Sequence, residues 1–296
     1  SANPSRTSDS KVRRLAQSIA NDLKLPDIIT VLELQDNDGP VDSGNTDASK
    51  SAARLIDAIR EVSGTRYECV NINPNDNEDG RQPGANIRVA YFYRPDRVQL
   101  KSAPAGNANE ANGWKNGQLT LNPGRVDPKN PLFDHTRKSL AAAFTFKGKD
   151  VVIIANHLNS KIGDDSLYGK HQPVVLRSEQ KRLQLAADIR KFVDEGLAQN
   201  PRMNLLLTGD FNDFEFSPVI RTLEGNNMTS VIHGYDPGDC YAYFYQGNDQ
   251  ILDNILVSDA LKGHYQFDIV HVNSSFMEEH GRVSDHDPLL IQLELQ

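Results

Sequence analysis

A single α/β domain is the fold class that the sequence predicts, and three observations support it. Short apolar runs rich in β-branched residues alternate with longer segments of helical periodicity along the 296 residues. No linker rich in Pro, Gly or Ser separates two cores, and no internal repeat is present. We therefore expect one domain over residues 1–296, with a long loop insertion at about 101–136, where Asn, Gly and Pro are frequent and clear periodicity is lacking.

Three segments show the three- and four-residue spacing of apolar side chains that is typical of one helix face. They are residues 12–23, 49–62 and 178–193. Ser8 or Ser10 is expected to cap the first helix and Pro26 to end it, while Gly64 is expected to close the second. Short β-rich runs predict strands at residues 27–33, 67–72, 87–93, 140–146, 151–157, 203–208, 241–245, 251–258, 265–272 and 288–295.

The composition is typical of a globular protein. Hydrophobic residues make up 38% and charged residues 24%, and no apolar run approaches the roughly 20 residues of a spanning helix, so we expect no membrane insertion. Cys69 and Cys240 are too few for a disulfide framework or a four-thiolate zinc site, and whether they pair is left open. The net charge of −8 argues weakly against a general polyanion binder.

Chemically capable side chains follow several predicted strands at the point where each strand ends. Ligand sites of layered α/β folds gather at strand ends, because the sheet holds the loops in place. Acids, amides and histidines together would make an oxygen-rich site for a hard divalent cation such as Mg²⁺. The side chains are Glu33, Asn156, His157, Asn159, Lys161, Asp210, Asn212, Asp213, Asp253, Asn254, Asp285, His286 and Asp287.

Each of these positions also has a purely structural explanation. Glu33 can be a surface acid after a strand, and Asp210 and Asn212 can form a turn. A lone His157 after an apolar strand is more often a hydrogen-bonded structural residue than a catalyst. Residues 284–287 can cap the last strand without any chemistry. Their occurrence together and in this order is hard to attribute to chance.

The order and composition of these motifs resemble the endonuclease/exonuclease/phosphatase superfamily. The resemblance extends from residue 11 to the end of the chain, and residues 156–161 are most similar to large secreted bacterial nucleases of this superfamily. It implies a four-layer, two-sheet α/β sandwich like that of deoxyribonuclease I, with its active site at one edge of the paired sheets. The motifs are Leu32-Glu33, Asn156-His157-Leu158, Gly209-Asp210-Phe211-Asn212, Leu252-Asp253-Asn254-Ile255-Leu256-Val257 and Ser284-Asp285-His286-Asp287-Pro288.

The resemblance implies a catalytic group for phosphodiester hydrolysis. Asp210 and Asn212 match the pair that positions the attacking water and contacts the phosphate. His286 matches the histidine that acts as general base or stabilises the transition state, and Asp253 matches the acid that orients it. His157 matches a second histidine, which contacts phosphate or serves as the acid. The reaction needs an in-line water, a near-neutral proton carrier and charge neutralisation, which such residues can supply.

The same resemblance implies metal and substrate ligands. Glu33 matches the metal-binding glutamate and Asp285 a further acid of the metal site, with Mg²⁺ as the expected ion and Mn²⁺ or Ca²⁺ as alternatives. Arg137 falls where deoxyribonucleases of this superfamily have a phosphate-contacting arginine. Asn159 and Lys161 are also expected to bind substrate.

Three positions depart from the pattern of the family. The family's first strand, which ends in an Asn of the site, is not found, because Asn3 is followed by Pro4 and no apolar run precedes it. We therefore expect a truncated chain whose activity is in question. Ile87 stands where animal deoxyribonucleases have a glutamate that pairs with the second histidine, so His157 is expected to be oriented differently. Asn254 replaces a histidine of many relatives.

The leading expectation is a Mg²⁺-dependent deoxyribonuclease, monomeric and extracellular or on the surface of a bacterium, with RNA as the alternative substrate. The location is implied by the resemblance alone. Between residues 161 and 191, seven Lys and Arg face four Asp and Glu, an excess that suits either a DNA backbone or a solvated helix face. The loop around Trp114 either touches substrate or only packs.

Two other functions stay open. A phosphatase or phosphodiesterase of the same superfamily that acts on phosphoinositides or sphingomyelin would need an exposed aromatic hairpin, whereas the alternating pattern of 241–245 predicts a buried strand. An inactive module that binds metal or nucleic acid is the second alternative. Residues 75–80 resemble the start of a calcium loop, but Asn86 stands at its twelfth position, so we expect a solvated turn.

Overall fold

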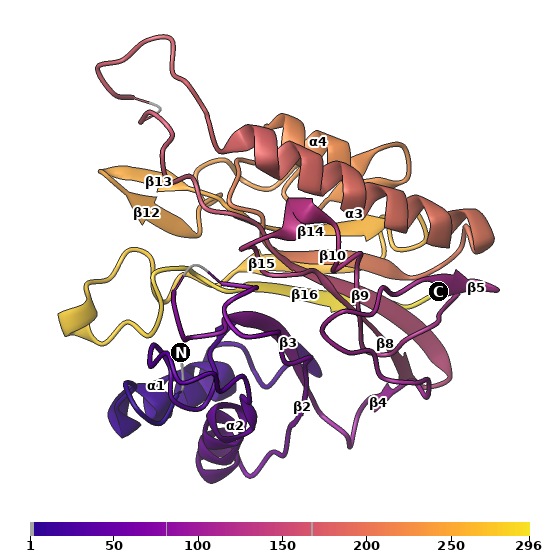
Figure 1. The fold of residues 1–296 in the computed structure, drawn as a ribbon, viewed down its shortest axis with the longest axis horizontal. Coiled ribbons are helices and arrows are strands. Elements are labelled where there is room, and N and C mark those ends of the chain that lie inside the picture. Colours follow the sequence, from indigo (N-terminus) through magenta and orange to yellow (C-terminus); the bar gives the residue numbers. More distant parts are fainter. Residues whose placement is uncertain (1–2, 81, 167) are drawn as a thin grey trace.

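The computed structural model describes residues 3–80, 82–166 and 168–296. Two sheet systems occupy the middle of the molecule, and helices cover them on both outer sides (Figure 1). One pair of helices is α3 (Glu179–Gln199) and α4 (Pro218–Glu224), and the other is α1 (Asp9–Asn21) and α2 (Ser49–Ser63). This layered α/β arrangement confirms the predicted fold class.

The larger sheet has the strand order β11-β14-β10-β9-β8-β4, with β7 paired to β8. Strands β9 and β10 run parallel and are connected through α3, whereas β14 runs antiparallel to β10. The end of β10 and the start of β14 therefore lie at the same edge. The bounds are β4 (Gln99–Leu100), β7 (Gly124–Arg125), β8 (Leu140–Phe146), β9 (Lys149–His157), β10 (Leu205–Asp210), β11 (Met228–Ser230) and β14 (Asp253–Ser258).

The smaller sheet has the order β1-β3-β2, and a separate pair of strands, β15 and β16, lies beside it in the second layer (Figure 1). The register of β1 against β3 shifts between Val31 and Leu34, so Glu33 lies in a β-bulge with a φ of 56°. The bounds are β1 (Ile28–Leu34), β2 (Glu68–Val70), β3 (Arg88–Tyr93), β15 (Tyr265–Ile269) and β16 (Leu289–Leu293).

The main core lies between the two sheets. Buried Val89, Ile153 and Val257 belong to one apolar cluster there, and β15 and β16 pack partly buried side chains against it. The Tyr91 hydroxyl crosses the interface and lies 2.6 Å from the Leu140 carbonyl oxygen, so its polar end is satisfied inside the core. Separate apolar clusters join α3 and α4 to the larger sheet and α1 and α2 to the smaller one.

The helix ends follow the predicted capping in two of three cases. The Ser8 side chain accepts from the Lys11 amide at the start of α1, and Gly64 ends α2 with a φ of 73°. Pro26 does not end α1, which stops at Asn21, before Lys24 and Leu25 take left-handed conformations. Within the described residues, no helix has both the length and the apolar character needed to cross a membrane.

The insertion at 101–136 is more ordered than the sequence predicts. It contains β5 (Trp114–Lys115), β6 (Gln118–Leu119), β7 and the short 3₁₀ helix η1 (Pro131–Phe133). The Trp114 ring packs on Phe192 of α3 with ring centroids 5.0 Å apart, and its Nε1 donates to the Phe192 carbonyl at 2.8 Å. Of the two roles expected for the loop around Trp114, packing is therefore the one that the Trp114 side chain performs.

The prediction of a buried strand at 241–245 is wrong. Strand β12 covers only Tyr243–Tyr245 and pairs with β13 (Asn248–Gln250) in an isolated two-stranded ribbon. Phe244 is 51% and Tyr245 49% exposed. Alternating apolar residues predict a half-buried strand only when a sheet covers one face, and no other strand pairs with this ribbon among the described residues.

Candidate active site

Three of the predicted site residues lie in one row across neighbouring strands. In the register of β9 and β10, His157 pairs with Asp210, and in that of β10 and β14, Asp210 pairs with Asp253. Parallel strands end at the same edge of a sheet, and an antiparallel neighbour begins there, so the topology places all three side chains together.

His286 completes the row from the segment before β16. Its Nδ1 lies 2.6 Å from Oδ2 of Asp253, which is a short, charge-assisted hydrogen bond. Burial lowers the pKa of His286, but the carboxylates of Asp253, Asp210 and Asp285 outweigh burial and raise that pKa to about 10. His286 is therefore an imidazolium at neutral pH.

Asp210 is held as a buried carboxyl in a tight turn. Its Oδ1 accepts from the backbone amide of Asn212 at 2.7 Å, and its Oδ2 accepts from the Asn212 side chain at 3.1 Å. Burial and the nearby charge of Asp253 raise the pKa of Asp210. Strand β10 needs Gly209, which has a φ of 131°, because a Cβ there would lie 1.9 Å from the carbonyl oxygen of Asn156 on β9.

His157 is neutral in this environment. Its Nε2 lies 3.5 Å from Oδ2 of Asp210, and its buried Nδ1 has no hydrogen-bond partner among the described residues. Burial, the Arg137 guanidinium and the His286 charge all hold the pKa of His157 well below its usual value. The sequence predicts only a different orientation of His157, from the isoleucine at position 87, and that orientation stays a prediction.

Arg137 lies beside this row. Its Nη2 donates to the Leu158 carbonyl at 2.6 Å, and the Asn212 side chain donates to the same oxygen at 3.0 Å. The guanidinium is largely buried, and its charge lowers the pKa of both His157 and Asp210. The structure thus places Arg137 beside the row of His157 and Asp210, and its contact with phosphate stays a prediction.

Asn159 and Lys161 lie in the segment that follows β9, and their side chains contact other protein groups. Asn159 donates to the Ser178 carbonyl at 3.4 Å, while its buried Oδ1 has no partner among the described residues. Lys161 Nζ lies 3.5 Å from Oδ1 of Asp213 and 4.4 Å from the centre of the Phe214 ring. Burial lowers the pKa of Lys161.

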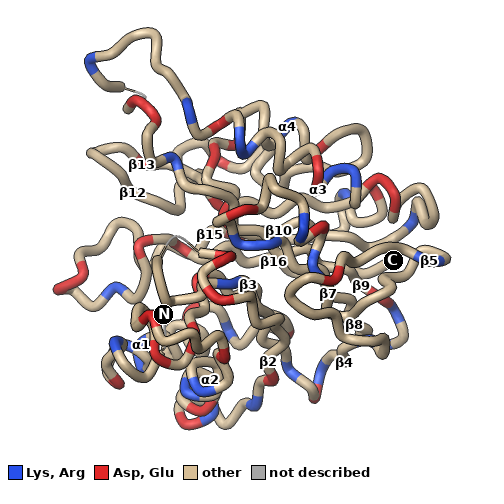
Figure 2. Tube along the Cα trace, viewed as in Figure 1, with Lys and Arg blue, Asp and Glu red and all other residues tan. Residues whose placement is uncertain are grey.

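Two of the seven bases between residues 161 and 191, Arg182 and Arg190, are buried and do not contribute to a basic surface. Arg182 is fully buried and forms ion pairs with Asp213 at 2.8 Å and Asp164 at 3.5 Å. Arg190 pairs with Asp194, four residues further along α3. Figure 2 shows Lys and Arg interspersed with Asp and Glu over the molecule in this view. Both expected roles, a DNA-binding face and a solvated helix face, are therefore wrong for the two buried arginines.

Glu33 and Asp285 are exposed carboxylates, and a divalent metal fits them only in a water-rich site. Among the described residues, no three His, Cys, Asp or Glu side chains converge closely enough to hold an ion. Mg²⁺ keeps several waters and is often held by one or two carboxylates, so exposed acids suit it. The carboxylates of Asp210 and Asp253 repel each other, and a nearby cation would reduce this repulsion.

Tyr243, near the site, was not recognised from the sequence, and Asp287 was noted there without an assigned role. The Tyr243 ring lies against the His286 ring, with centroids 4.6 Å apart, and a β-bridge links the two residues. Asp287 accepts from the backbone amides of Val272, Asn273 and Ser274 and so orders the loop beside His286. Asp287 was visible in the last motif, whereas nothing in the sequence places Tyr243 on the histidine.

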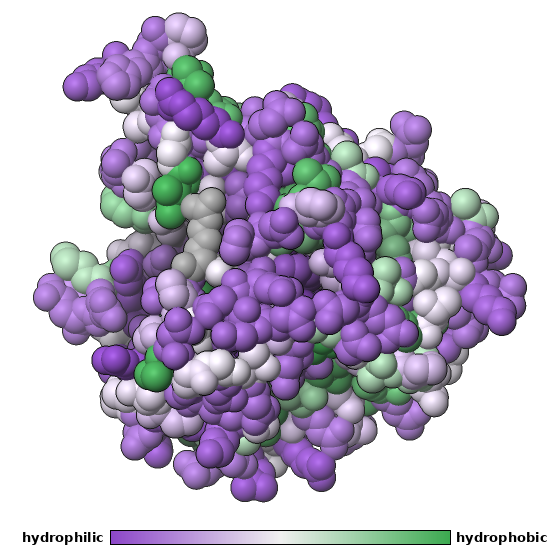
Figure 3. Space-filling model, in the orientation of Figure 1, coloured by the Kyte–Doolittle hydropathy of each residue, from purple (hydrophilic) through white to green (hydrophobic). Residues whose placement is uncertain are grey.

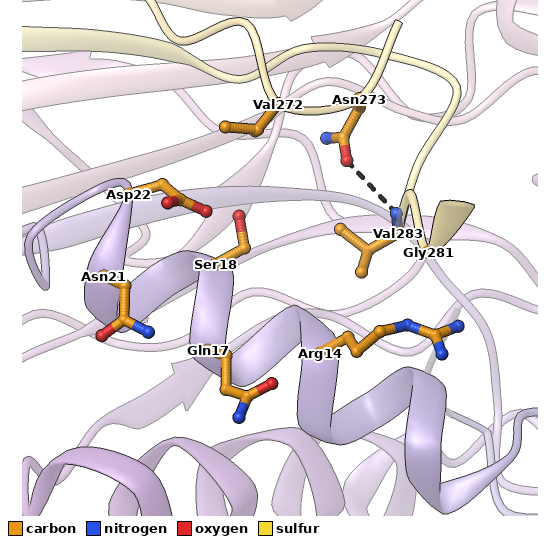
Figure 4. Close-up of a pocket in the computed structure, with 9 residues that line it drawn as sticks. All are labelled: Arg14, Gln17, Ser18, Asn21, Asp22, Val272, Asn273, Gly281 and Val283. Carbon is orange, nitrogen blue, oxygen red and sulfur yellow. Dashed lines mark hydrogen bonds between the residues drawn. The ribbon is translucent and has the colours of Figure 1, made fainter. Parts of the chain in front are cut away.

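A surface pocket of about 190 Å³ lies between α1 and the loops that precede β16. Arg14 and Ser18 approach it from α1, and Asp22 lies directly after this helix. The Asn273 side chain faces the pocket from the opposite loop, where it accepts from the Val283 amide at 3.2 Å (Figure 4). None of His157, Asp210, Asp253 and His286 lines this pocket. Its link to the site is indirect, through the Asn273 amide that donates to the His286 carbonyl.

The side chain of Asn3 contacts residues that follow strand β1. It is buried, and its side-chain amide donates to Oε1 of Gln35 at 2.5 Å. A side chain at Gly39 would meet it at 3.0 Å. Asn3 therefore packs against the segment that follows Glu33.

Comparisons with known proteins identify the family and the fold. The sequence profile of the Endonuclease/Exonuclease/phosphatase family matches residues 120–292. An endonuclease/exonuclease/phosphatase from Bacteroides vulgatus has a TM-score of 0.56 at 18% identity, over 97% of this chain and 91% of that chain. A truncated Caenorhabditis elegans TDP2 has a TM-score of 0.58 at 15% identity, with the same two coverages.

A D. rerio TDP2 complexed with a single-strand DNA product has a TM-score of 0.54 at 17% identity, over 95% of this chain and 90% of that chain. No curated protein matches the sequence. At these identities the solved structures show a common fold, and the profile covers more than half of the chain. The chain therefore belongs to the endonuclease/exonuclease/phosphatase family, whose members hydrolyse phosphoester bonds and generally use divalent metals.

Proposed function

We propose that this chain is a Mg²⁺-dependent deoxyribonuclease, monomeric and extracellular or on the surface of a bacterium. The observation that carries the hydrolytic proposal is the row of His157, Asp210 and Asp253 across three strands, completed by His286 on Asp253. The motif resemblance to deoxyribonucleases supports the DNA substrate. The location rests on the similarity of residues 156–161 to secreted bacterial nucleases.

His286 would stabilise the transition state rather than remove a proton. Its pKa is raised to about 10, so it carries a positive charge at neutral pH. Nδ1 is engaged by Asp253, which leaves Nε2 as the nitrogen that would meet a non-bridging phosphate oxygen. A fixed cation in a site of low dielectric stabilises the charge that builds up as water attacks phosphorus.

Asp210 would accept the proton of the attacking water. A carboxylate whose pKa is raised by burial and by Asp253 is a stronger base than an ordinary aspartate. Asn212, bonded to both oxygens of Asp210, fixes the direction of that carboxylate. The neutral His157 and the guanidinium of Arg137 would then contact the phosphate from the other side of Asp210.

Glu33 and Asp285 would hold Mg²⁺ together with water. The ion would supply a Lewis acid and neutralise charge on the phosphate. The exposure of both carboxylates and the surplus of acid in the row support this assignment.

Nicking of supercoiled plasmid tests the proposal. We expect activity with Mg²⁺, none with EDTA, and a loss of about 10²- to 10⁴-fold in His286→Ala, the range that removal of a proton-transferring or charge-stabilising group produces. His264→Ala is the matched control. His264 is a half-exposed histidine that directly precedes β15 and pairs with Glu294. Nicking that resists EDTA, or that is undiminished in His286→Ala, would contradict the mechanism.

A lipid phosphodiester is the second candidate substrate, and the exposed ribbon of β12 and β13 is the observation that favours it. Sphingomyelin and phosphoinositide vesicles belong in the same assay. Lipid turnover without DNA cleavage would assign the chain to lipids, and retained DNA binding without any turnover would indicate the inactive binding module. Light scattering during gel filtration tests the expected monomer.

A further inference from the structure

An aromatic row leads outward from the candidate catalytic histidine. The Tyr243 ring lies on the His286 ring at 4.6 Å, and the Tyr245 ring lies 6.3 Å beyond Tyr243 at an interplanar angle of 13°. Tyr243 and Tyr245 share one face of β12, because alternate residues of a strand point the same way. Tyr245 is 49% exposed, so the row begins in the site and ends in solvent.

The face that carries the two tyrosines is also suited to polar recognition. Across the ribbon, Tyr243 pairs with Gln250 and Tyr245 pairs with Asn248. Side chains of directly paired residues lie on the same face, so two amides flank the two rings. Flat aromatic surfaces combined with amide donors and acceptors match the π-face and the edge of a nucleobase.

We propose that Tyr243 and Tyr245 form a stacking surface for unpaired bases, which makes a single-stranded nucleic acid the preferred substrate. This inference rests on the proposed function and specifies the substrate of that site. A base in a duplex is already stacked on both faces, so its π-face is not accessible to Tyr245. A strand whose bases stack on the row would run directly past His286.

The surroundings of the ribbon favour a nucleic acid over a membrane. Phe244, on the opposite face of β12, pairs with Asp249, an exposed carboxylate that a lipid surface would have to desolvate. On the face of the molecule in Figure 3, hydrophobic residues occur in separate small groups rather than in one continuous patch. The ribbon is also tied to the loop before α3, where Ser166 donates to Gln246 at 3.2 Å, and Figure 1 shows the two segments side by side.

Binding measured without turnover gives the first test. Fluorescence anisotropy of a labelled single-stranded oligonucleotide in EDTA should give a Kd about tenfold higher for Tyr245→Ala than for the unaltered chain, since one stacked base contributes on the order of tenfold or more. Tyr245→Phe should restore the affinity, because the ring is kept. Phe244→Ala is the matched control, since it removes an equally exposed ring from the other face and should change Kd less than twofold.

Kinetics give the second test. The ratio of KM for the oligonucleotide to KM for bis(p-nitrophenyl) phosphate should rise about tenfold in Tyr245→Ala, whereas the same ratio for a blunt duplex of equal sequence should not change. An unchanged Kd and KM for the single strand in Tyr245→Ala, with unaltered circular dichroism, would overturn the proposal. Equal losses on single strand and duplex would overturn it as well.

The remaining outcomes separate this inference from the proposed function. If the unaltered chain cleaves no phosphodiester but loses oligonucleotide affinity in Tyr245→Ala, the proposed function fails and the stacking surface stands. If Tyr245→Ala and Phe244→Ala both weaken binding to phosphatidylcholine–phosphatidylserine vesicles while oligonucleotide affinity is unchanged, the ribbon is a membrane contact and the stacking surface fails.

Discussion

Single contacts determine the charge state of the residues in the candidate site. Burial alone would keep His286 neutral, and the carboxylate of Asp253 at 2.6 Å reverses this. Because the pKa of about 10 lies above the ordinary value of 6.5, the ion pair stabilises the fold fully below about pH 6.5. This contribution is lost as the pH rises through about 10.

Asp253→Asn should lower the pKa of His286, since the charge that opposes burial is removed. We expect the alkaline limb of the kcat profile to move to lower pH and kcat at neutral pH to fall. An NMR titration of His286 measures the pKa without any need for activity. Asp259→Asn, at the other end of β14, is the control and should leave the titration unchanged. An unaltered His286 titration in Asp253→Asn would contradict the assignment.

The buried pair of Arg182 and Asp213 supports the loop that carries Asn159 and Lys161. Arg182→Ala removes the closer of the two cations beside buried Asp213 and leaves only Lys161, at 3.5 Å, so we expect the free energy of unfolding to fall by about 3 kcal/mol. Lys191→Ala, an exposed position on the same helix, should stay within about 0.5 kcal/mol. Urea unfolding measures both, and equal small effects would show that the buried pair is not required.

Among the elements, the insertion at 101–136 packs closely against α3 at Trp114. A Cβ at Gly196 would lie 2.6 Å from the Trp114 ring, so the helix has a glycine where the ring sits. Alanine improves helix propensity by about 1 kcal/mol, whereas overpacking costs about 1–3 kcal/mol. The second effect should dominate as long as the indole is present.

Gly196→Ala should therefore lower the free energy of unfolding by about 1 kcal/mol in the unaltered chain and raise it by up to about 1 kcal/mol in a Trp114→Ala background. Urea unfolding of the four proteins gives the coupling energy directly. The same effect in both backgrounds would mean that Trp114 does not rest on this glycine in solution.

Over the whole molecule, strand bounds that depend on the local pattern of apolar residues could be predicted from the sequence. Features that depend on which strands or side chains pair with each other could not. Strand β8 has the predicted bounds, Leu140–Phe146, because a long apolar run can only be buried. The ribbon of β12 was predicted as buried because alternation does not reveal whether a sheet lies behind it. The ion pair of Arg182 with Asp213, 31 residues away, was likewise invisible in a count of charges.

The candidate site shows the same division. The residue types of the row could be predicted because polar side chains at strand ends are unusual after buried runs. Their alignment could not, because the pairing of His157 with Asp210 and of Asp210 with Asp253 is a property of sheet register. The role of Glu33 stays a prediction, because no cluster of three metal-binding side chains is found among the described residues.

Metal binding should couple to the stability of the entire fold. Asp210 and Asp253 of the row repel each other, and Glu33 and Asp285 come from opposite ends of the chain, so an ion held by Glu33 and Asp285 stabilises the native state by mass action. At a Mg²⁺ concentration of 100 Kd, the gain is about 2.7 kcal/mol. Differential scanning calorimetry should show Tm rising with Mg²⁺, and Glu33→Gln should remove the rise, whereas Glu61→Gln on the exposed side of α2 should preserve it. A Tm that rises equally in Glu33→Gln would place the ion elsewhere, and a Tm that does not depend on Mg²⁺ would contradict binding of the ion to the native state. In either case the charge of His286 would act on phosphate without a metal on Glu33.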